Sequence, residues 1–300
     1  MMMTADKPPV CDYEGSDYQS TFWDTGGREY EDQVEALALR RLLPKSGSMM
    51  LEIGAGAGRN TPRYDAYQKI VLLDYSATQL QQAQANLGTS ERYTYVAADV
   101  YQLPFVPGVF DGATMIRTLH HMAEPRLALQ QVRSAMQPGA NFILEYANKH
   151  NLKAMLRYAL GRQTWSPYSP EAVEFTELNF DFHPRSIRLW LESSGFSVNR
   201  QLTVSHFRVE AIKRLFPLDL LVKLDGMAQL TGDWWQLSPS VFVSTTATGD
   251  TPTASQEMMF RCLVCGQSDF ESNTAALTCR SCGHAWSCEN GIYDFRLKGS

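Results

Sequence analysis

Residues 49–60, Met-Met-Leu-Glu-Ile-Gly-Ala-Gly-Ala-Gly-Arg-Asn, restrict the possible folds of this chain more than any other stretch. A short apolar run, of the kind that forms a buried parallel strand, is followed at once by glycine at positions 54, 56 and 58. Glycine lets a backbone turn tightly and brings bare N–H groups up to a ligand. The next residues read as a helix start, whose N-terminus favours a polar or anionic group. The stretch therefore predicts the strand–loop–helix corner of a nucleotide-type site.

Two ligand classes use such a corner. The dinucleotide-binding fingerprint places its third glycine where Arg59 stands in this chain. Here the third glycine is Gly58, and an acidic residue, Glu52, stands two places before the first glycine. The loop alone leaves both classes open, and the residues downstream must distinguish them.

Strand and helix patterns alternate after this corner. Strands are expected at 69–74, 91–97, 110–116 and 141–146, and helices at 31–43, 77–87 and 126–136. Short connections between them favour a parallel sheet with helices on both faces. Asp74 ends the second strand, where a carboxylate can accept both hydroxyls of a ribose, and Tyr75 follows it as a candidate adenine contact.

Several short motifs in register make the pattern specific. In order and spacing the chain resembles the class I S-adenosylmethionine-dependent methyltransferases over about residues 30–146, and more loosely to 248. The resemblance implies an α/β fold with a doubly wound, mostly parallel, seven-stranded sheet. It rests on Glu52 with the three glycines, Leu73-Asp74-Tyr75-Ser76, Ala98-Asp99-Val100, Leu103-Pro104-Phe105, Phe110-Asp111 and Gln137-Pro138-Gly139.

The same resemblance implies roles for individual residues. Gly54 and Gly56 would pass close to the methionine part of S-adenosylmethionine, Asp74 would hold the ribose, and Asp99 with Val100 the adenine edge. The dinucleotide alternative predicts neither Asp99 nor the turn at 138–139. The expected cofactor-binding residues are Tyr30, Glu52, Gly54, Ala55, Gly56, Asp74, Tyr75, Asp99, Val100 and Arg117.

The residues after the fourth strand bear on the reaction. Methyl transfer from a sulfonium is an in-line displacement, so the enzyme mainly aligns the acceptor and in some cases removes a proton. No Asn/Asp-Pro-Pro-Tyr motif follows the strand, and the middle of the chain has no cysteine, which disfavours amino-group methylation of adenine or glutamine and carbon-5 methylation of pyrimidines. We expect transfer to oxygen, nitrogen or activated carbon of a small metabolite. His120 or His121 is the candidate base, with a structural role as the alternative.

Two segments flank the expected methyltransferase domain at 37–248. Residues 1–36 are expected to form a tail and an aromatic flap, which either covers the cofactor or packs in an ordinary way. An insertion at about 148–185 holds an aromatic cluster, which either roofs the acceptor side or forms a satellite core. Its basic stripe of Lys149, Lys153 and Arg157 is either a solvated face or a contact for an anionic substrate.

A linker at 249–257 leads to the clearest metal signal, in a terminal segment at 258–300. Two C-x-x-C-G motifs place Cys262, Cys265, Cys279 and Cys282 as the ligands of a structural zinc ion in a zinc ribbon, with a redox dithiol role as the alternative. So short a segment is too small for a stable apolar core, so the metal would supply folding energy. The segment resembles the small zinc-ribbon activator of tRNA, rRNA and release-factor methyltransferases.

The overall charge restricts the partners. A formal net charge of −5 predicts no broad attraction to nucleic acid or to an anionic membrane. No apolar run approaches the roughly 20 residues of a membrane span, and the start of the chain lacks a secretory signal, so we expect a cytoplasmic location. Three hypotheses remain: a small-metabolite methyltransferase, an RNA or protein methyltransferase that uses the ribbon for recognition, and a non-catalytic binding protein of the same fold.

Overall fold

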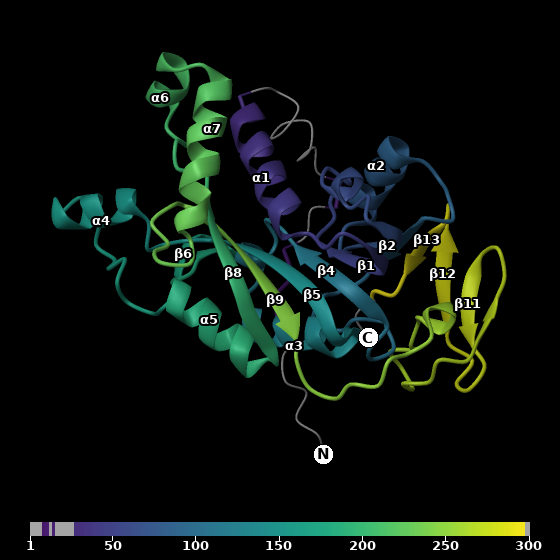
Figure 1. Ribbon diagram of the computed structural model, residues 1–300. Coiled ribbons are helices and arrows are strands. Elements are labelled where there is room, and N and C mark those ends of the chain that lie inside the picture. The colour runs from purple at the N-terminus through teal and green to yellow at the C-terminus, as the bar shows by residue number, and fades with distance from the viewer. Residues whose placement is uncertain (1–7, 12–13, 16–26, 298–300) are drawn as a thin grey trace.

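A computed structural model describes residues 8–11, 14–15 and 27–297. One large mixed sheet organises them, with β1 between β2 and β4 in parallel pairing (Figure 1). The antiparallel strand β9 lies between β5 and β8 near one edge. The sequence predicted these seven strands, which run in space as β3 (Tyr93–Ala97), β2 (Tyr67–Asp74), β1 (Gly47–Ile53), β4 (Phe110–Met115), β5 (Met136–Ala147), β9 (Ser240–Ala247) and β8 (Phe196–Val204).

Helices cover both faces of this sheet because its central strands are apolar on both sides. In β1, Leu51 and Ile53 point into one core cluster and Met50 into the other, as the two-residue period of a strand requires. The first cluster is closed by α3 (Pro125–Ala135) and α5 (Pro184–Ser193), and the second by α1 (Glu29–Leu42), α2 (Ala77–Leu87) and α7 (Leu218–Ala228) (Figure 1).

The pattern of residues 211–230 predicts mixed helix limited by Pro217, and the structure has α6 (Glu210–Leu215) and α7 on either side of this proline. Two other local predictions need correction. Residues 138–139, expected to form a turn, lie inside β5, which starts at Met136. The pattern of residues 148–161 predicts one helix, but only α4 (Leu152–Ala159) is helical, and the aromatic insertion continues into a hairpin of β6 (Val173–Thr176) and β7 (Asn179–Asp181).

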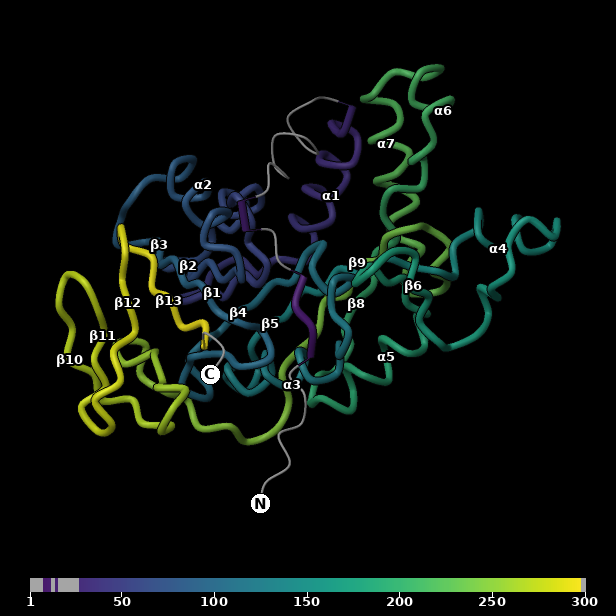
Figure 2. The backbone as a smooth tube through the Cα atoms, turned by 180° about the vertical axis from the view of Figure 1, so that it is seen from behind, coloured from purple at the N-terminus to yellow at the C-terminus, as the bar shows by residue number. Residues whose placement is uncertain are grey.

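The cysteine-rich tail is not a separate body. Its strands are β10 (Phe270–Ser272), β11 (Ala276–Cys279), β12 (Ala285–Glu289) and β13 (Ile292–Asp294). β13 pairs in parallel with β3, so the tail extends the main sheet to 11 strands (Figure 2). Phe295 is fully buried, with its ring 5.0 Å from those of Phe260 and Trp286, and Phe260 stacks on Phe105 of the main domain. The cysteine-rich tail and the rest of the sheet therefore share one hydrophobic core.

Candidate functional site

The glycine loop has a backbone that only glycine adopts easily. Gly54 has φ +68°, and a Cβ atom there would lie 2.2 Å from Oγ1 of Thr118. Gly58 has φ +78°, and a Cβ atom there would lie 2.7 Å from Leu87 on α2. The loop therefore packs directly against the residues after β4 and against α2, which leaves no room for side chains at these positions.

A cavity opens at the carboxyl ends of β1 and β2, where open α/β sheets bind their ligands. The cavity and the open space at its mouth together measure about 810 Å³. A second, smaller cavity on the other side of the loop includes Glu52 and Ala55. The first cavity is lined by many of the residues expected from the sequence: Gly54, Gly56, Asp74, Tyr75, Val100, Arg117 and His121.

Asp74 joins the glycine loop to the end of β2. Its Oδ2 accepts a hydrogen bond from the Gly56 N–H at 2.8 Å, and its Oδ1 accepts one from the Ser76 N–H at 2.9 Å. Asp74 therefore holds the glycine loop against the end of β2, and it also lines the cavity. Its contact with a ribose stays a prediction.

Asp99 lies on the neighbouring strand end but faces a different environment. Asp74 is paired with Ala97 in the sheet, so the two carboxylates follow adjacent strand ends. The Asp99 side chain is buried, and its Oδ1 accepts a hydrogen bond from the Tyr101 N–H at 2.9 Å. Val100 and Tyr101 line the cavity, whereas Asp99 supports the turn behind them. Its contact with adenine stays a prediction.

Arg117 is held between two buried carboxylates. Its Nε donates to Glu35 at 2.7 Å, and its backbone N–H donates to Glu145 at 2.9 Å. Burial alone would raise the pKa of Glu35, but the guanidinium groups of Arg117 and Arg59 outweigh it and lower that pKa to about 2. Burial raises the pKa of Glu52 to about 7, although the hydroxyl of Thr61 donates to this carboxylate. The loop is therefore flanked by an ion-pair network and by a carboxyl that titrates near neutrality.

The two histidines have different positions. The rings of His120 and His121 are 4.0 Å apart, but only His121 is among the residues that line the main cavity. Burial lowers the pKa of His121, and its Nδ1 lies 3.2 Å from the carbonyl oxygen of Leu178 in the insertion. Burial lowers the pKa of His120 still further. His121 is the better placed candidate base, because it is neutral at pH 7 and reaches the cavity.

Tyr30, expected at the cofactor, has a different role. It is buried on α1, its hydroxyl donates to Asp225 of α7 at 2.6 Å, and it accepts a hydrogen bond from the Phe207 N–H at 3.0 Å. It lines neither cavity. Tyr30 therefore ties α1 to α7. The aromatic flap expected around Phe22 and Trp23 lies outside the described residues.

Part of the tail expected at 1–36 lies at this cavity. Residues 9–11 line it, and Val10 bridges to Met122. Glu14 accepts hydrogen bonds from the N–H groups of residues 77 and 78 at the start of α2, at 3.0 and 3.1 Å. Arg296, just after β13, donates to Glu14 and to the carbonyl of Tyr75, both at 3.1 Å. The segments around residues 14 and 296 therefore meet beside the cavity, a contact that no local motif encodes.

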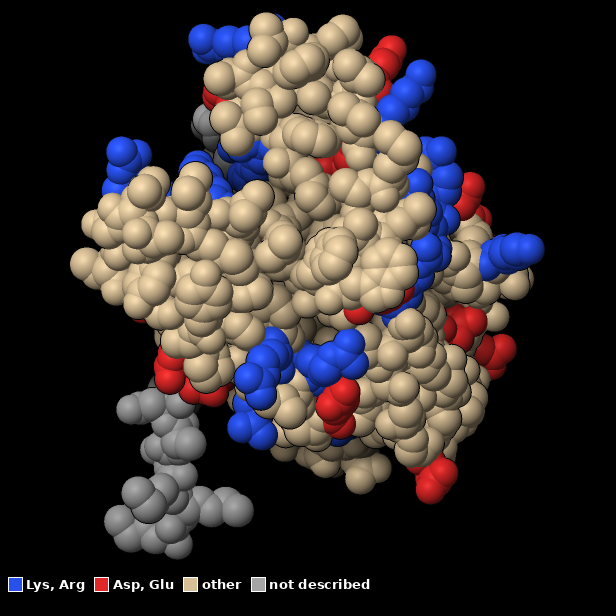
Figure 3. Space-filling view, turned by 60° about the vertical axis from the view of Figure 1, so that its left-hand side comes forward, with Lys and Arg blue, Asp and Glu red and all other residues tan. Residues whose placement is uncertain are grey.

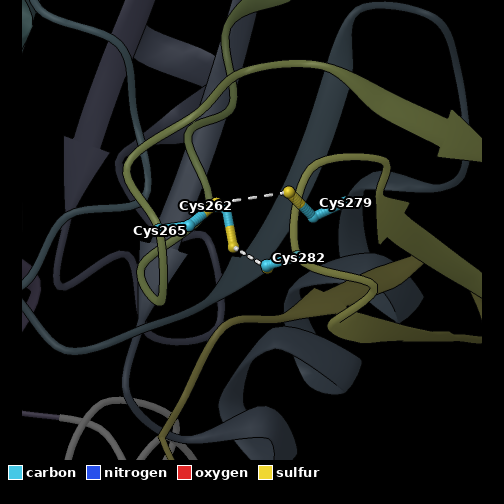
Figure 4. A group of neighbouring side chains, drawn as sticks. All are labelled: Cys262, Cys265, Cys279 and Cys282. Carbon is cyan, nitrogen blue, oxygen red and sulfur yellow. Dashed lines mark hydrogen bonds between the residues drawn. The ribbon is translucent and has the colours of Figure 1, made fainter.

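The four cysteines of the ribbon converge (Figure 4). Their sulfur atoms all lie within 4.8 Å of one another, with 3.7 Å between Cys262 and Cys282 and 3.5 Å between Cys265 and Cys279. Tetrahedral ligands at the usual zinc–sulfur distance are about 3.8 Å apart. Tight turns behind each pair, at Gly266 and Gly283, bring the thiols together. The donor set and its spacing fit a zinc ion.

Comparison with known proteins agrees with this architecture. Residues 51–144 match the family described as "Methyltransferase domain". The chain is 32% identical over 111 residues to O-methyltransferase cnsE of Penicillium expansum. This alignment covers 35% of the present chain and 40% of the relative. It is 25% identical over 169 residues to a demethylmenaquinone methyltransferase of Clavibacter sepedonicus. This second alignment covers 55% of the present chain and 69% of the relative.

A solved structure shows the same fold. It is the complex between the Haloferax volcanii Trm112 methyltransferase activator and the putative methyltransferase, matched with a TM-score of 0.55 at 14% identity over 77% of this chain and 96% of that chain. The strand order and this likeness show an α/β fold with a mostly parallel sheet, and the family match identifies a methyltransferase domain over residues 51–144. Among the described residues, the helices are too short or too polar to cross a bilayer.

Proposed function

We propose that this protein is an S-adenosylmethionine-dependent methyltransferase that methylates oxygen, nitrogen or activated carbon of a small metabolite. The observation that carries the proposal is the cavity at the carboxyl ends of β1 and β2, where the glycine loop, Asp74 and His121 meet. The relatives named above, an O-methyltransferase and a demethylmenaquinone methyltransferase, support a small acceptor.

The residues of the cavity fit the proposed cofactor. The loop brings bare backbone up to the cavity at Gly54 and Gly56, and Asp74 offers carboxylate oxygens suited to a ribose diol. Tyr75 and Val100 supply apolar walls suited to a purine ring. S-adenosylmethionine supplies an electrophilic methyl group on a sulfonium when it is bound.

The remaining residues align the acceptor and exclude water. His121, neutral because burial lowers its pKa, is placed to take a proton from an acceptor hydroxyl or amine at the ring nitrogen that does not face Leu178. Leu178 belongs to the turn between β6 and β7, so the insertion approaches the cavity from the side of His121. This contact supports the insertion as the acceptor side of the site.

We also propose that the four cysteines hold a structural zinc ion. The sulfur atoms are close enough to share one ion, and the strands around them complete the sheet edge at β3. The zinc ribbon would therefore stabilise the strand that ends beside Val100.

Calorimetry and a methyl-transfer assay test the enzyme. We expect S-adenosylmethionine to bind with one site per chain, and Asp74→Asn to weaken binding by about tenfold or more through loss of charge-assisted hydrogen bonds to the ribose. Labelled methyl groups should appear in extracts of small metabolites and disappear with His121→Ala. No binding of the cofactor would favour a non-catalytic protein of the same fold.

A second candidate acceptor is RNA or protein. It is favoured by the ribbon and by the likeness to a complex that contains a methyltransferase activator. Label transferred to tRNA, rRNA or protein rather than to the small-molecule fraction, together with salt-dependent binding of RNA, would establish it in place of the first.

A further inference from the structure

An exposed apolar surface lies beyond the acceptor side of the site. On α4, Leu152, Leu156 and Leu160 are all more than half exposed. A second set on α7 and the turn after it comprises Leu224, Met227, Leu230, Trp234 and Trp235, with Trp234 76% exposed. We call these eight residues the α4–Trp surface. Monomeric proteins rarely expose so many large apolar side chains together, so this surface indicates a binding site for a partner.

The two parts of the α4–Trp surface are physically joined. The N–H of Leu152 donates to the carbonyl of Leu237 at 2.9 Å, and the side chain of Asn148 donates to the carbonyl of Gln236 at 2.9 Å. These bonds fix the start of α4 beside the chain that follows the tryptophans. Figure 3 turns this side of the molecule forward and shows a broad area of uncharged residues, with both basic and acidic residues around its edges.

The charges around this surface differ in sign from those of the whole chain. Residues 146–170 contain no Asp or Glu, whereas the complete chain has a net charge of −5. Lys153, Arg157 and Arg162 are exposed along and just after α4, and Lys223 is exposed on α7. The α7 part of the surface also has two exposed carboxylates, Asp219 and Asp233, so the excess of basic residues lies at α4. Basic side chains thus accompany the apolar ones.

We propose that the α4–Trp surface docks the protein on the surface of an anionic phospholipid bilayer. A short amphipathic helix with an exposed row of leucines and a row of Lys and Arg beside it suits the plane of a membrane interface. Adjacent tryptophans suit the headgroup level, because their rings are apolar and their N–H groups are polar. Docking of this kind needs no spanning helix, and it departs from the expectation of no membrane contact that the net charge suggested.

A second copy of the chain fits this surface less well. A symmetric dimer would set the surface against itself, and the exposed basic residues beside it (Lys153, Arg157, Arg162 and Lys223) outnumber the two exposed carboxylates, Asp219 and Asp233. Anionic headgroups supply the opposite charge along the whole rim.

The position of the surface also has a consequence for the site, which rests on the proposed function. Lys149, just before α4, donates its N–H to Phe182 at the end of the insertion, and the insertion contacts His121 through Leu178. The docked protein would hold the acceptor side of the cavity next to the bilayer, where apolar acceptors concentrate.

Flotation with lipid vesicles tests the proposal on the full chain. We expect binding to vesicles of phosphatidylglycerol and phosphatidylcholine, weak binding to phosphatidylcholine alone, and release by high salt. Lys153→Gln with Arg157→Gln should lower the partition coefficient about 25-fold, since each basic residue at an anionic surface contributes about fivefold. Leu156→Ser should lower it about tenfold or more.

Leu189→Ser is the matched control, because Leu189 on α5 is 61% exposed, against 59% for Leu156, and lies outside the surface. It should bind vesicles like the original protein. All variants should keep the original melting temperature and affinity for S-adenosylmethionine, which separates this test from that of the enzyme. Failure to bind anionic vesicles at low salt, or equal binding by Leu156→Ser, would overturn the proposal. So would a dimer that Leu156→Ser dissociates in the absence of vesicle binding.

Discussion

Replacing Gly54 with alanine tests the reasoning about the glycine loop directly. Two costs can be separated at this position. Its positive φ, +68°, costs a residue with a Cβ atom about 1–2 kcal/mol. The added atom would also lie 2.2 Å from Oγ1 and 2.4 Å from Cγ2 of Thr118, and overpacking of this kind costs about 1–3 kcal/mol. We therefore expect Gly54→Ala to lower the free energy of unfolding by about 2–5 kcal/mol.

Gly88 provides the control for the backbone cost. It has φ +80° at the end of α2, and a Cβ atom there would meet nothing within 4 Å. Its ψ of −177° lies in a region that is essentially restricted to glycine, so Gly88→Ala should lower the free energy of unfolding by about 1–3 kcal/mol through the backbone alone. It should leave cofactor affinity unchanged, whereas Gly54→Ala should weaken it, because Gly54 lines the cavity.

A double-mutant cycle with Thr118→Gly isolates the packing cost. Thr118 donates a hydrogen bond to the carbonyl of Ile116 at 3.0 Å, so its removal alone costs about 1 kcal/mol. In the double variant the clash is absent, and the two changes should couple favourably by at least about 1 kcal/mol. Urea unfolding measures stability, and calorimetry measures cofactor binding. If Gly54→Ala costs no more than Gly88→Ala, or if Thr118→Gly gives no rescue, the steric account of the loop is wrong.

Three further predictions concern the ribbon, the N-terminal segment and pH. Cys279→Ser should release zinc. It should also lower the melting temperature of the whole chain, because β13 pairs with β3 and Phe295 is fully buried. Zinc analysis and calorimetry measure these two effects, and an unchanged main unfolding transition would contradict the shared core. Arg296→Gln should weaken S-adenosylmethionine binding about three- to tenfold through loss of its bonds to Glu14 and Tyr75, whereas the exposed Arg280→Gln in the ribbon should not. The pKa of Glu52 is about 7 in the folded state against 4.5 ordinarily, so its ionisation lowers the stability of the fold as pH rises from 4.5 to 7, and this loss levels off above pH 7. Glu52→Gln should therefore be more stable than the original protein by up to about 3 kcal/mol at pH 8, and by little below pH 4.5. Equal pH profiles of the two proteins in urea unfolding would refute the burial argument.

The strands and the glycine loop were predictable because their determinants are local. Few folds are compatible with an apolar strand that is buried on both faces and is followed by glycines and a helix start. The boundaries of α2 and α3 follow from such local signals, and they agree with the sequence to within a residue. The division into α6 and α7 follows from Pro217, which limits the helix at this point.

The candidate site was predictable only where a residue sits at a strand end. Asp74 and Val100 face the cavity because the sheet brings adjacent strand ends together. Tyr30 was assigned to the cofactor from its place before the first strand, but its partner, Asp225, is 195 residues away in the chain. The distinction between His120 and His121 depends on which ring reaches the cavity, and neighbours in sequence carry no information about that.

By itself, the sequence determined the class of sheet, the loop conformation and the four thiols, since each depends on the chemistry or spacing of a few neighbouring residues. Only the tertiary structure decided that β13 joins β3, that residues 9–11 line the cavity, and that α4 and the tryptophans form one surface. The physical reason is that these contacts connect segments far apart in the chain. Pairing at a sheet edge or closure of a cavity depends on how the whole core packs, and no single segment encodes it.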